Sequence, residues 1–167
     1  MFIPGGRAYD WGAHFIDWLL NLLPFKVESV YGFYQKRLWF DVTNEDHGQI
    51  ILRLEGGRYA DSQVSEMSAV DKPKWRILGT KGALVLNKNE DKIDVVAFIR
   101  DFREEMRIPF PANNYISYYI NVADHLLTGE HLEVTPESAR RVIAVLELAE
   151  KSAKSGKAES FLPMSKK

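Results

Sequence analysis

Apolar side chains near the start of the chain recur with the spacing of a helix. Trp11, Phe15, Trp18 and Leu22 fall at i, i+4, i+7 and i+11, which places them along one side of a helical segment. Pro24 follows, and proline ends a helix because it lacks an N–H donor and its ring clashes with the preceding turn. The pattern predicts a helix over residues 9–23.

Between residues 26 and 99 the period changes to two. Ile50, Leu52 and Leu54 alternate with polar positions, as they do in a strand with one buried face. Turn-forming residues divide this region into about six strands; they occupy positions 44–48, 56–57, 72–73, 79–82 and 87–91. Such short connections favour antiparallel pairing, because a parallel neighbour needs a crossover of a dozen or more residues.

The helical period returns in the last third of the chain. Two neighbouring apolar stripes over residues 115–127 predict a second helix that Gly129 ends. A third helix is expected to begin at Thr135, which is suited to the N-cap, and at Pro136, which is suited to the first helical position. Gly156 lies where that helix would end.

The order helix, strands, helix, helix predicts an α+β fold. We expect an open, predominantly antiparallel β-sheet of about six strands, with helices packed on one face. The length of 167 residues corresponds to a single domain over 1–167. Large apolar side chains on the other face of the sheet need cover, so we expect that face to associate with a second copy of the chain.

Composition removes several classes of function. Lys and Arg number 22 against 23 Asp and Glu, and a net charge of −1 offers no field for nucleic acid or an anionic membrane. The chain has no cysteine, so it has no disulfide, thiolate nucleophile or Cys-ligated metal. The apolar stretch at 15–25 is about half the ~20 residues of a membrane span. With no signal-peptide pattern at the N-terminus, we expect a cytoplasmic protein.

The positions of the glycines exclude two nucleotide-binding motifs. No two glycines are separated by two positions, so the G-x-G of a dinucleotide-binding turn is absent, and no two are five apart, as a P-loop requires. The G-x-S-x-G and H-E-x-x-H patterns of two hydrolase classes are also missing. Nucleotide binding by this chain alone is therefore not expected.

Three polar residues in the first helix form the main candidate site. Asp10, His14 and Asp17 are spaced by four and three residues, which predicts one shared helix face. A carboxylate beside an imidazole favours its role as a base near neutral pH. Two other interpretations stay open: a partly buried histidine held by structural hydrogen bonds, and a metal site, for which one nitrogen and two carboxylates are a poor ligand set.

A second candidate is an aromatic cluster in the predicted second helix. Tyr115, Tyr118 and Tyr119 lie close together in the sequence. Tyr115 and Tyr119 are candidates for lining a polyol pocket, whereas core packing would account for at least two of the three tyrosines.

Three motifs in order along the chain carry a family resemblance. Gly5 and Gly6 precede an Asp10-x-Gly12-x-His14-x-x-Asp17 segment; residues 77–86 read ILGTKGALVL; and residues 129–156 carry VTPESA followed by a terminal glycine. Together they resemble the C-terminal domain of the NAD(P)-dependent oxidoreductases named for glucose-fructose oxidoreductase, inositol dehydrogenase and the rhizopine-catabolism protein (Gfo/Idh/MocA). The resemblance spans about residues 5–163.

The resemblance implies a role for each candidate. His14 would be the general acid/base at the substrate hydroxyl, with Asp10 orienting it or holding a neighbouring hydroxyl. Asp17 would have a supporting or substrate-binding role beside Tyr115 and Tyr119. The implied substrate is a sugar, polyol or related hydroxy compound, and the implied assembly is a homodimer or larger homo-oligomer through the free sheet face.

The resemblance also implies NAD or NADP as the cofactor, bound mainly by a Rossmann domain that precedes this domain in the family. That domain and its E-K-P motif are absent from the sequence. We therefore expect no cofactor or metal on this chain alone, and no turnover by it. The alternative is a stand-alone, non-catalytic binding or scaffolding module of the same fold.

Overall fold

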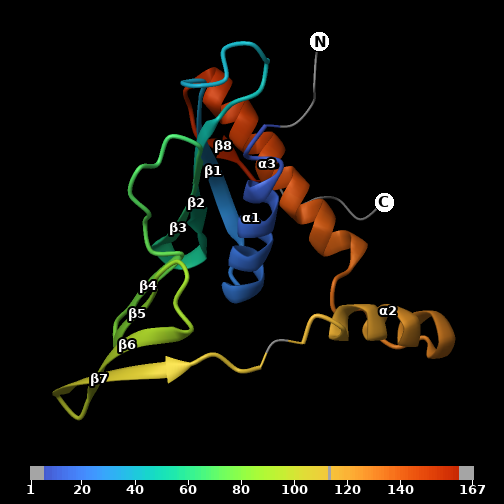
Figure 1. Cartoon of the computed structure of the whole chain (residues 1–167). Helices are drawn as coiled ribbons and strands as arrows, with labels where there is room; N and C mark the ends of the chain where they lie inside the picture. Colours follow the sequence, from blue (N-terminus) through green and yellow to red (C-terminus); the bar gives the residue numbers. More distant parts are fainter. Residues whose placement is uncertain (1–5, 113, 162–167) are drawn as a thin grey trace. The chain divides into compact units, whose positions relative to one another are not determined.

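The computed structural model describes residues 6–112 and 114–161. The chain forms two compact units (Figure 1). Unit 1 combines Met1–Met67 with Leu132–Lys167, and unit 2 is Ser68–His131. Two segments distant in the sequence thus build unit 1, while unit 2 is continuous.

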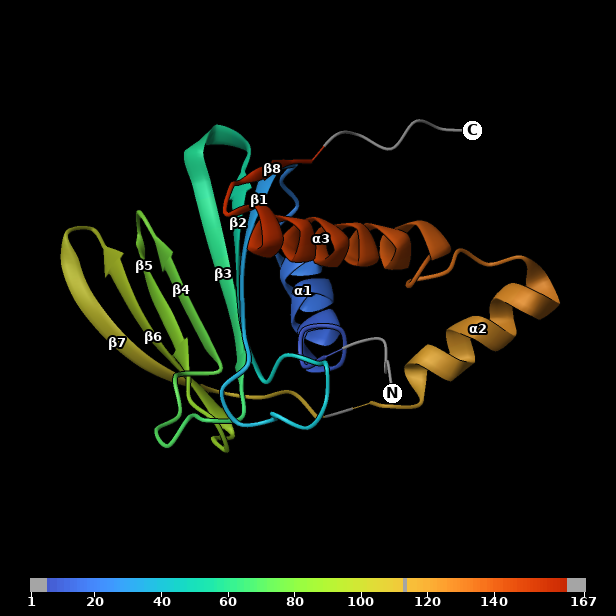
Figure 2. The same ribbon diagram turned by 90° about the horizontal axis from the view of Figure 1, so that it is seen from above.

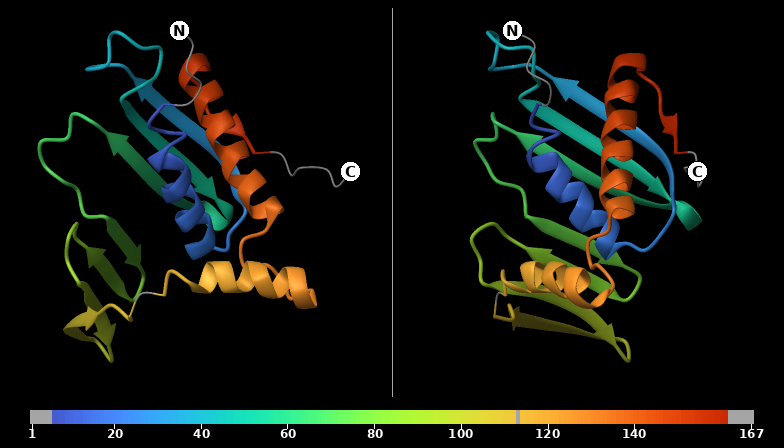
Figure 3. Two further views of the ribbon diagram at one scale, coloured as in Figure 1. Left: turned by 45° about the vertical axis from the view of Figure 1, so that its right-hand side comes forward. Right: turned by 90° about the vertical axis from the view of Figure 1, so that its right-hand side faces the viewer.

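Unit 1 is a four-stranded sheet with two helices. Its elements are α1 (Trp11–Leu22), β1 (Val27–Gln35), β2 (His47–Leu54), the single 3₁₀ turn η1 (Glu55–Gly57), β3 (Arg58–Ser65), α3 (Pro136–Ser155) and β8 (Glu159–Ser160). The strand order is β3-β2-β1-β8, and each neighbouring pair is antiparallel. Both α1 and α3 lie on the same side of this sheet (Figures 2 and 3).

The core of unit 1 fills the layer between the two helices and the sheet. Its most buried apolar side chains are Ile16, Leu19, Val30, Ile50, Leu52, Leu54, Val145, Leu146 and Ala149. Alternate residues of β2 point into this layer, which explains the period of two in the sequence. The prediction of helices on one face of an antiparallel sheet is confirmed.

The ends of α3 follow from its capping residues. The side-chain oxygen of Thr135 accepts a hydrogen bond from the backbone N–H of Ser138 at 3.1 Å, and Pro136 occupies the first helical position. Gly156 ends the helix with φ +69°, a left-handed conformation that glycine adopts without strain. These three features of the predicted helix are confirmed.

Unit 2 contains four strands and one helix. Its elements are β4 (Trp75–Gly79), β5 (Gly82–Leu86), β6 (Lys92–Ile99), β7 (Phe102–Pro109) and α2 (Ser117–Thr128). The strand order is β4-β5-β6-β7, with antiparallel hairpins throughout. Arg100 and Asp101 make the tight turn between β6 and β7 with positive φ angles of 49° and 69°.

The α+β class and the antiparallel pairing are therefore confirmed, with one difference in the strands. The described residues hold eight strands in two four-stranded sheets, where the sequence indicates about six strands in one sheet. β7 lies beyond residues 26–99, where the sequence indicates strands, and Glu104 interrupts its apolar row of Phe102, Met106 and Ile108. β8 has only two residues, too few for any periodicity.

The helix α2 departs from the sequence prediction in its burial. It forms where the apolar stripes indicate, and Gly129 ends it with φ +78°. None of its residues is buried, however. Tyr115, Tyr118 and Tyr119 are all exposed, so the interpretation that core packing accounts for at least two of them is wrong. Periodicity identified the helix but not whether this chain covers its apolar side.

No helix among the described residues combines the length and apolar character needed to cross a membrane. The apolar segment that begins at Phe15 is part of α1, which is 12 residues long.

A buried carboxylate organises the loop between β1 and β2. Asp46 is fully buried, and its side-chain oxygens accept hydrogen bonds from the backbone N–H groups of Arg37, Leu38 and Trp39. Burial alone would raise the pKa of Asp46, but these three N–H donors hold it below its usual range. The ionised Asp46 carboxylate thus supplies hydrogen-bond acceptors for backbone N–H groups of the loop, which would otherwise lack them.

The close contact between β1 and α3 predicts a large effect of one added methyl group. In Gly32→Ala the new Cβ would lie 2.1 Å from the backbone oxygen of Ala149, so the helix must move. We expect the free energy of unfolding to fall by about 1–3 kcal/mol or more, measured by urea denaturation. Gly48→Ala in β2 is the control, because its Cβ would meet neighbours at 3.5 Å or beyond. Equal stability of the two variants would contradict this packing.

The Asp46 site predicts a defined acid sensitivity. Because its pKa is lowered by folding, the stabilisation from Asp46 is present above the unfolded value of 3.8 and is lost as the pH falls through the folded value. Asp46→Asn should lower stability at neutral pH and flatten the loss of stability below about pH 4, as measured by urea denaturation across pH. Asp41→Asn, at an exposed position in the same loop, should change neither.

Candidate functional site

The predicted acid/base residues lie at the start of α1. Asp10 immediately precedes the helix, and His14 follows within its first turns. The preceding turn is closed by the N–H groups of Tyr9 and Asp10, which both donate to the carbonyl oxygen of Gly6 at 3.1 Å. This turn fixes where α1 begins and therefore where Asp10 and His14 stand relative to each other.

Two carboxylates attach this turn to the loops beside the sheet. The N–H of Ala8 donates to the side chain of Glu45 at 3.1 Å, and the N–H of Arg7 donates to the backbone oxygen of Glu45 at 3.3 Å. The guanidinium of Arg7 also forms an ion pair with Glu66, just after β3. Contacts with Glu45 and with Glu66 thus both hold the start of α1 in place.

The side chain of Asp10 is engaged by Arg7. One guanidinium nitrogen of Arg7 lies 3.1 Å from the Asp10 carboxylate. Asp10 has φ −84° and ψ −97°, which is not helical, so its side chain does not follow the i, i+4 geometry that would direct it to His14. The structure thus places Asp10 next to Arg7, a residue that the sequence analysis did not single out.

His14 lies on the exposed side of α1 between two tryptophans. Its ring centroid is 5.8 Å from that of Trp11 and 6.3 Å from that of Trp18. Its side chain is exposed and, among the described residues, makes no hydrogen bond. This arrangement does not match a buried histidine held by structural hydrogen bonds, and it leaves the imidazole nitrogens accessible to a small molecule.

The buried side of α1 explains why His14 faces outward. The residues that α1 buries are Gly12, Ile16, Leu19 and Leu20. Because a helix turns 100° per residue, burying this side directs positions 11, 14 and 18 away from the core. Asp17 is half-buried at the border between the two sides.

A partly buried contact connects the same turn to α3. The hydroxyl of Tyr9 donates to the Glu150 side chain at 2.9 Å. Burial raises the pKa of Tyr9, and the neighbouring carboxylate of Glu150 raises it further. The pKa of Glu150 is lowered by hydrogen bonds from Lys154 and Tyr9. Neither group changes its protonation near neutral pH. This contact therefore holds the turn in place and does not take part in proton transfer.

The two tyrosines proposed as substrate-binding residues lie in unit 2. Tyr115 precedes α2 and Tyr119 lies within it, with 81% and 71% of their surfaces exposed. Tyr119 makes an edge-on ring contact with Tyr118 at a centroid distance of 5.3 Å. The structure therefore places His14 and Asp17 on α1 and Asp10 directly before it, all in unit 1, whereas the tyrosines belong to unit 2.

The described residues contain no group of three His, Asp or Glu side chains arranged to hold a metal ion. They also do not fit a dinucleotide. The strands pair only antiparallel within the described ranges, whereas a dinucleotide-binding turn joins a strand to a helix in a parallel βαβ unit.

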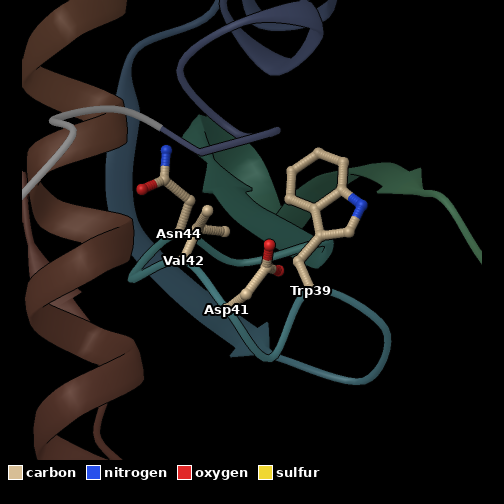
Figure 4. A pocket seen from close by; sticks show the side chains of 4 residues that line it. All are labelled: Trp39, Asp41, Val42 and Asn44. Atoms are coloured by element: carbon tan, nitrogen blue, oxygen red, sulfur yellow. The ribbon is translucent and has the colours of Figure 1, made fainter. Parts of the chain in front are cut away.

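A shallow hollow in the β1–β2 loop is the other candidate for a binding site. Trp39, Asp41, Val42 and Asn44 line an open space of about 340 Å³ (Figure 4). Figure 4 shows these side chains projecting from a loop with no histidine among them. The lining of the hollow has one titratable side chain, the Asp41 carboxylate, and so offers no acid/base pair. The residues at α1 therefore remain the stronger candidate site.

Solved structures show the same fold. A protein from Listeria innocua described as NAD-binding matches with a TM-score of 0.82 and 24% identity, over 93% of this chain and 48% of that one. The candidate oxidoreductase yvaA from Bacillus subtilis matches with a TM-score of 0.84 and 19% identity, over 95% and 52%. A candidate NADPH-dependent oxidoreductase from Desulfitobacterium hafniense matches at 0.79 and 24%, over 94% and 48%.

This chain spans about half the length of these structures. No curated protein matches its sequence. A family model, however, matches residues 2–85, about half of the chain and the part that contains α1 and the strands β1, β2 and β3 of unit 1. The model is described as the GFO/IDH/MocA C-terminal domain, so the chain belongs to the C-terminal domain of this oxidoreductase family.

Proposed function

We propose that this chain is the substrate-binding and proton-transfer part of an NAD(P)-dependent oxidoreductase that acts on a sugar, a polyol or a related hydroxy compound. The observation that carries the proposal is the exposed His14 in a family oxidoreductase domain, with its imidazole free of hydrogen bonds among the described residues. An accessible, neutral imidazole is the common general base at neutral pH.

The proposed chemistry assigns one proton to this chain. His14 accepts the proton of the substrate hydroxyl during oxidation and returns it in the reverse direction. Asp10 holds a neighbouring hydroxyl, or turns to His14 when substrate binds, because hydrogen bonds at catalytic sites are often loose before binding. Arg7 holds the Asp10 side chain in place through an ion pair at 3.1 Å. Asp17, Tyr115 and Tyr119 remain the proposed substrate contacts.

In this proposal, a separate dinucleotide-binding domain binds the nicotinamide cofactor. The sequence has no G-x-G turn, and the described residues have no βαβ unit. We therefore propose that the chain alone does not oxidise substrate. A cysteine-free chain and a soluble cofactor also agree with a cytoplasmic location.

We propose further that a second copy of the chain covers one face of the unit 2 sheet. The side chains on that face are Trp75, Ile77, Leu84, Leu86, Ile93, Val95, Ala97, Ile99, Phe102, Met106 and Ile108, by strand alternation and register. Of these, Leu86 is buried and the others are at least partly exposed. Glu104 is the charged residue of this face within β4–β7.

The opposite face of the same sheet has a different character. It carries several charged residues, among them Arg103, Glu105 and Arg107, beside apolar ones such as Leu78 and Phe98, and the ion pairs of Arg107 with Glu90 and Asp94 lie in water. A nearly uncharged face opposite a charged one is typical of a sheet with one side in an interface. A twofold pair would bury the apolar face of each copy against the other.

The acid/base role predicts a defined effect of His14→Ala. In a protein that joins this chain to a dinucleotide-binding domain, kcat should fall by about 10²–10⁴-fold, while cofactor affinity should not change. Steady-state kinetics and cofactor titration measure the two effects. His47→Ala is the control, because His47 lies in β2 and contacts Ser65. If His14→Ala retains full kcat, the chain acts as a binding or scaffolding module.

The interface predicts a contrast between two lysine substitutions. Met106→Lys places a charge on the apolar face, where 40% of Met106 is exposed. It should weaken self-association by about 100-fold or more, because a charge buried without a partner costs several kcal/mol. Phe98→Lys is the control on the opposite face, where 57% of Phe98 is exposed. Sedimentation velocity measures the oligomer, and a monomeric wild type would contradict the interface.

A further inference from the structure

The candidate residues Asp10 and His14 are held in place by different parts of unit 1. His14 lies on α1, whose orientation is set by the burial of Ile16 and Leu19. Asp10 lies in the turn of residues 6–10, which we call the entry turn, and its φ of −84° and ψ of −97° are not helical. The direction of the Asp10 side chain therefore depends on the conformation of the entry turn.

Glu45 binds the backbone of the entry turn at two successive residues. Its side chain accepts a hydrogen bond from the N–H of Ala8 at 3.1 Å, and its backbone oxygen accepts one from the N–H of Arg7 at 3.3 Å. Ala8 is fully buried, so water does not reach its N–H. Loss of the Glu45 carboxylate would leave a buried donor without an acceptor, which costs free energy.

Gly6 leaves the space that the Glu45 carboxylate occupies. A Cβ atom added at Gly6 would overlap this carboxylate. The carbonyl oxygen of Gly6 also accepts the N–H groups of Tyr9 and Asp10, both at 3.1 Å. The same glycine therefore closes the entry turn and makes room for the side chain that anchors it.

The backbone beside Glu45 is itself attached to the sheet of unit 1. The N–H of Asp46 donates to the backbone oxygen of Gln35 in β1 at 3.2 Å, and the N–H of Glu66, just after β3, donates to the backbone oxygen of Asp46 at 2.9 Å. Glu45 thus starts from a fixed backbone position. Through Glu45, the sheet determines where the entry turn lies.

We propose, on the basis of the function proposed above, that Glu45 is a positioning residue that sets Asp10 relative to His14. In this role its carboxylate binds the entry turn and not the substrate. The acceptor oxygen at the N–H of Ala8 matters, and the negative charge does not. A misplacement of about 1 Å in a reacting group can cost about 100-fold in rate, so a loosened entry turn should slow the reaction while His14 stays in place on α1.

The other long-range contacts of the entry turn are made by side chains. Arg7 reaches Glu66 with its guanidinium, and Tyr9 reaches Glu150 with its hydroxyl. Long side chains can keep such partners while the backbone that carries them shifts, because they have several rotatable bonds. Glu45 instead binds peptide groups of the turn directly. We therefore assign the backbone position of the turn to Glu45.

The first test uses the isolated chain. In Glu45→Ala the amide hydrogen of Ala8 should exchange with solvent about 10-fold faster or more, because a buried donor loses a charged acceptor. The ¹H–¹⁵N signals of residues 7–10 should move with it. Glu45→Gln keeps an acceptor oxygen and should stay close to the wild type in both. The matched control is Glu28→Ala, which removes an exposed ion pair with Arg53 and should change neither.

Gly6→Ala should reproduce the effect of Glu45→Ala without changing the carboxylate itself. The new Cβ displaces the end of the Glu45 side chain from the N–H of Ala8. Because both changes remove one contact, Ala8 in the double variant should exchange within about 2-fold of the faster single variant. Effects that multiply would show that the two residues act independently and would overturn the proposal.

The second test joins the chain to a dinucleotide-binding domain and supplies D-glucose, myo-inositol and sorbitol in turn with NAD⁺ and NADP⁺. Glu45→Ala and Gly6→Ala should lower kcat by about 10- to 100-fold and leave cofactor affinity unchanged. Glu45→Gln should recover kcat to within about 3-fold of the wild type. Thermal unfolding gives the folded fraction of each variant, so a loss of stability alone leaves kcat per folded molecule unchanged. Full kcat in Glu45→Ala, or an equal loss in Glu45→Gln, would overturn the proposal.

The variant His14→Ala separates this proposal from the function on which it rests. If His14→Ala keeps its turnover while Glu45→Ala loses it, the positioning role stands and the acid/base role fails. If His14→Ala loses its turnover while Glu45→Ala keeps it, the acid/base role stands and the positioning role fails. If none of the three compounds is oxidised, the proposed function fails, and the exchange of Ala8 and the signal of Asp10 in the isolated chain decide whether Glu45 fixes the entry turn.

Discussion

The burial of one side of α1 is the constraint on which the site depends. α1 packs on the sheet of unit 1 through Gly12, Ile16 and Leu19, beside α3 on the same face. Since a helix has a single orientation once one side is buried, His14 and its neighbouring tryptophans must point outward. The close approach of β1 to α3 at Gly32 fixes that layer, and through it the direction of the site.

The second requirement is that the start of α1 be held in place. Asp10 stands outside the helix, in the turn that leads into α1. Arg7, Glu45 and Tyr9 connect this turn to the loops beside the sheet and to α3. Hydrogen bonds and ion pairs of this kind keep an exposed site in its geometry before a substrate binds. The geometry of the proposed site thus depends on packing and hydrogen bonds within unit 1.

The sequence predicted the positions of the helices better than it predicted which of their side chains are buried. Helical spacing of Trp11, Phe15 and Trp18 located α1 correctly, yet the adjacent row of Gly12, Ile16 and Leu19 is the buried one. Two apolar rows on one helix have the same period, so spacing alone does not show which row faces the core. The tyrosines of α2 illustrate the same limit, since their period is helical and their side chains are exposed.

Candidate residues could be proposed from the sequence where they lie within a few positions of one another. The spacing of Asp10, His14 and Asp17 led to α1, which begins at Trp11, so Asp10 lies outside the helix. Family membership is confirmed, and the catalytic roles of these residues stay predictions. The contacts of Arg7 with Glu66 and of Tyr9 with Glu150 were not predictable, because 59 and 141 residues separate the partners. Long-range contacts of this kind follow from the fold and not from local sequence patterns.

We propose that this chain is the substrate-binding domain of an oxidoreductase and that another domain binds the cofactor. Isothermal titration of the chain with NAD⁺ and with NADP⁺ tests it directly. We expect no saturable heat of binding for either dinucleotide, because the sequence has no G-x-G turn and the described residues have no βαβ unit. Saturable binding of either cofactor in the micromolar range or tighter would contradict it.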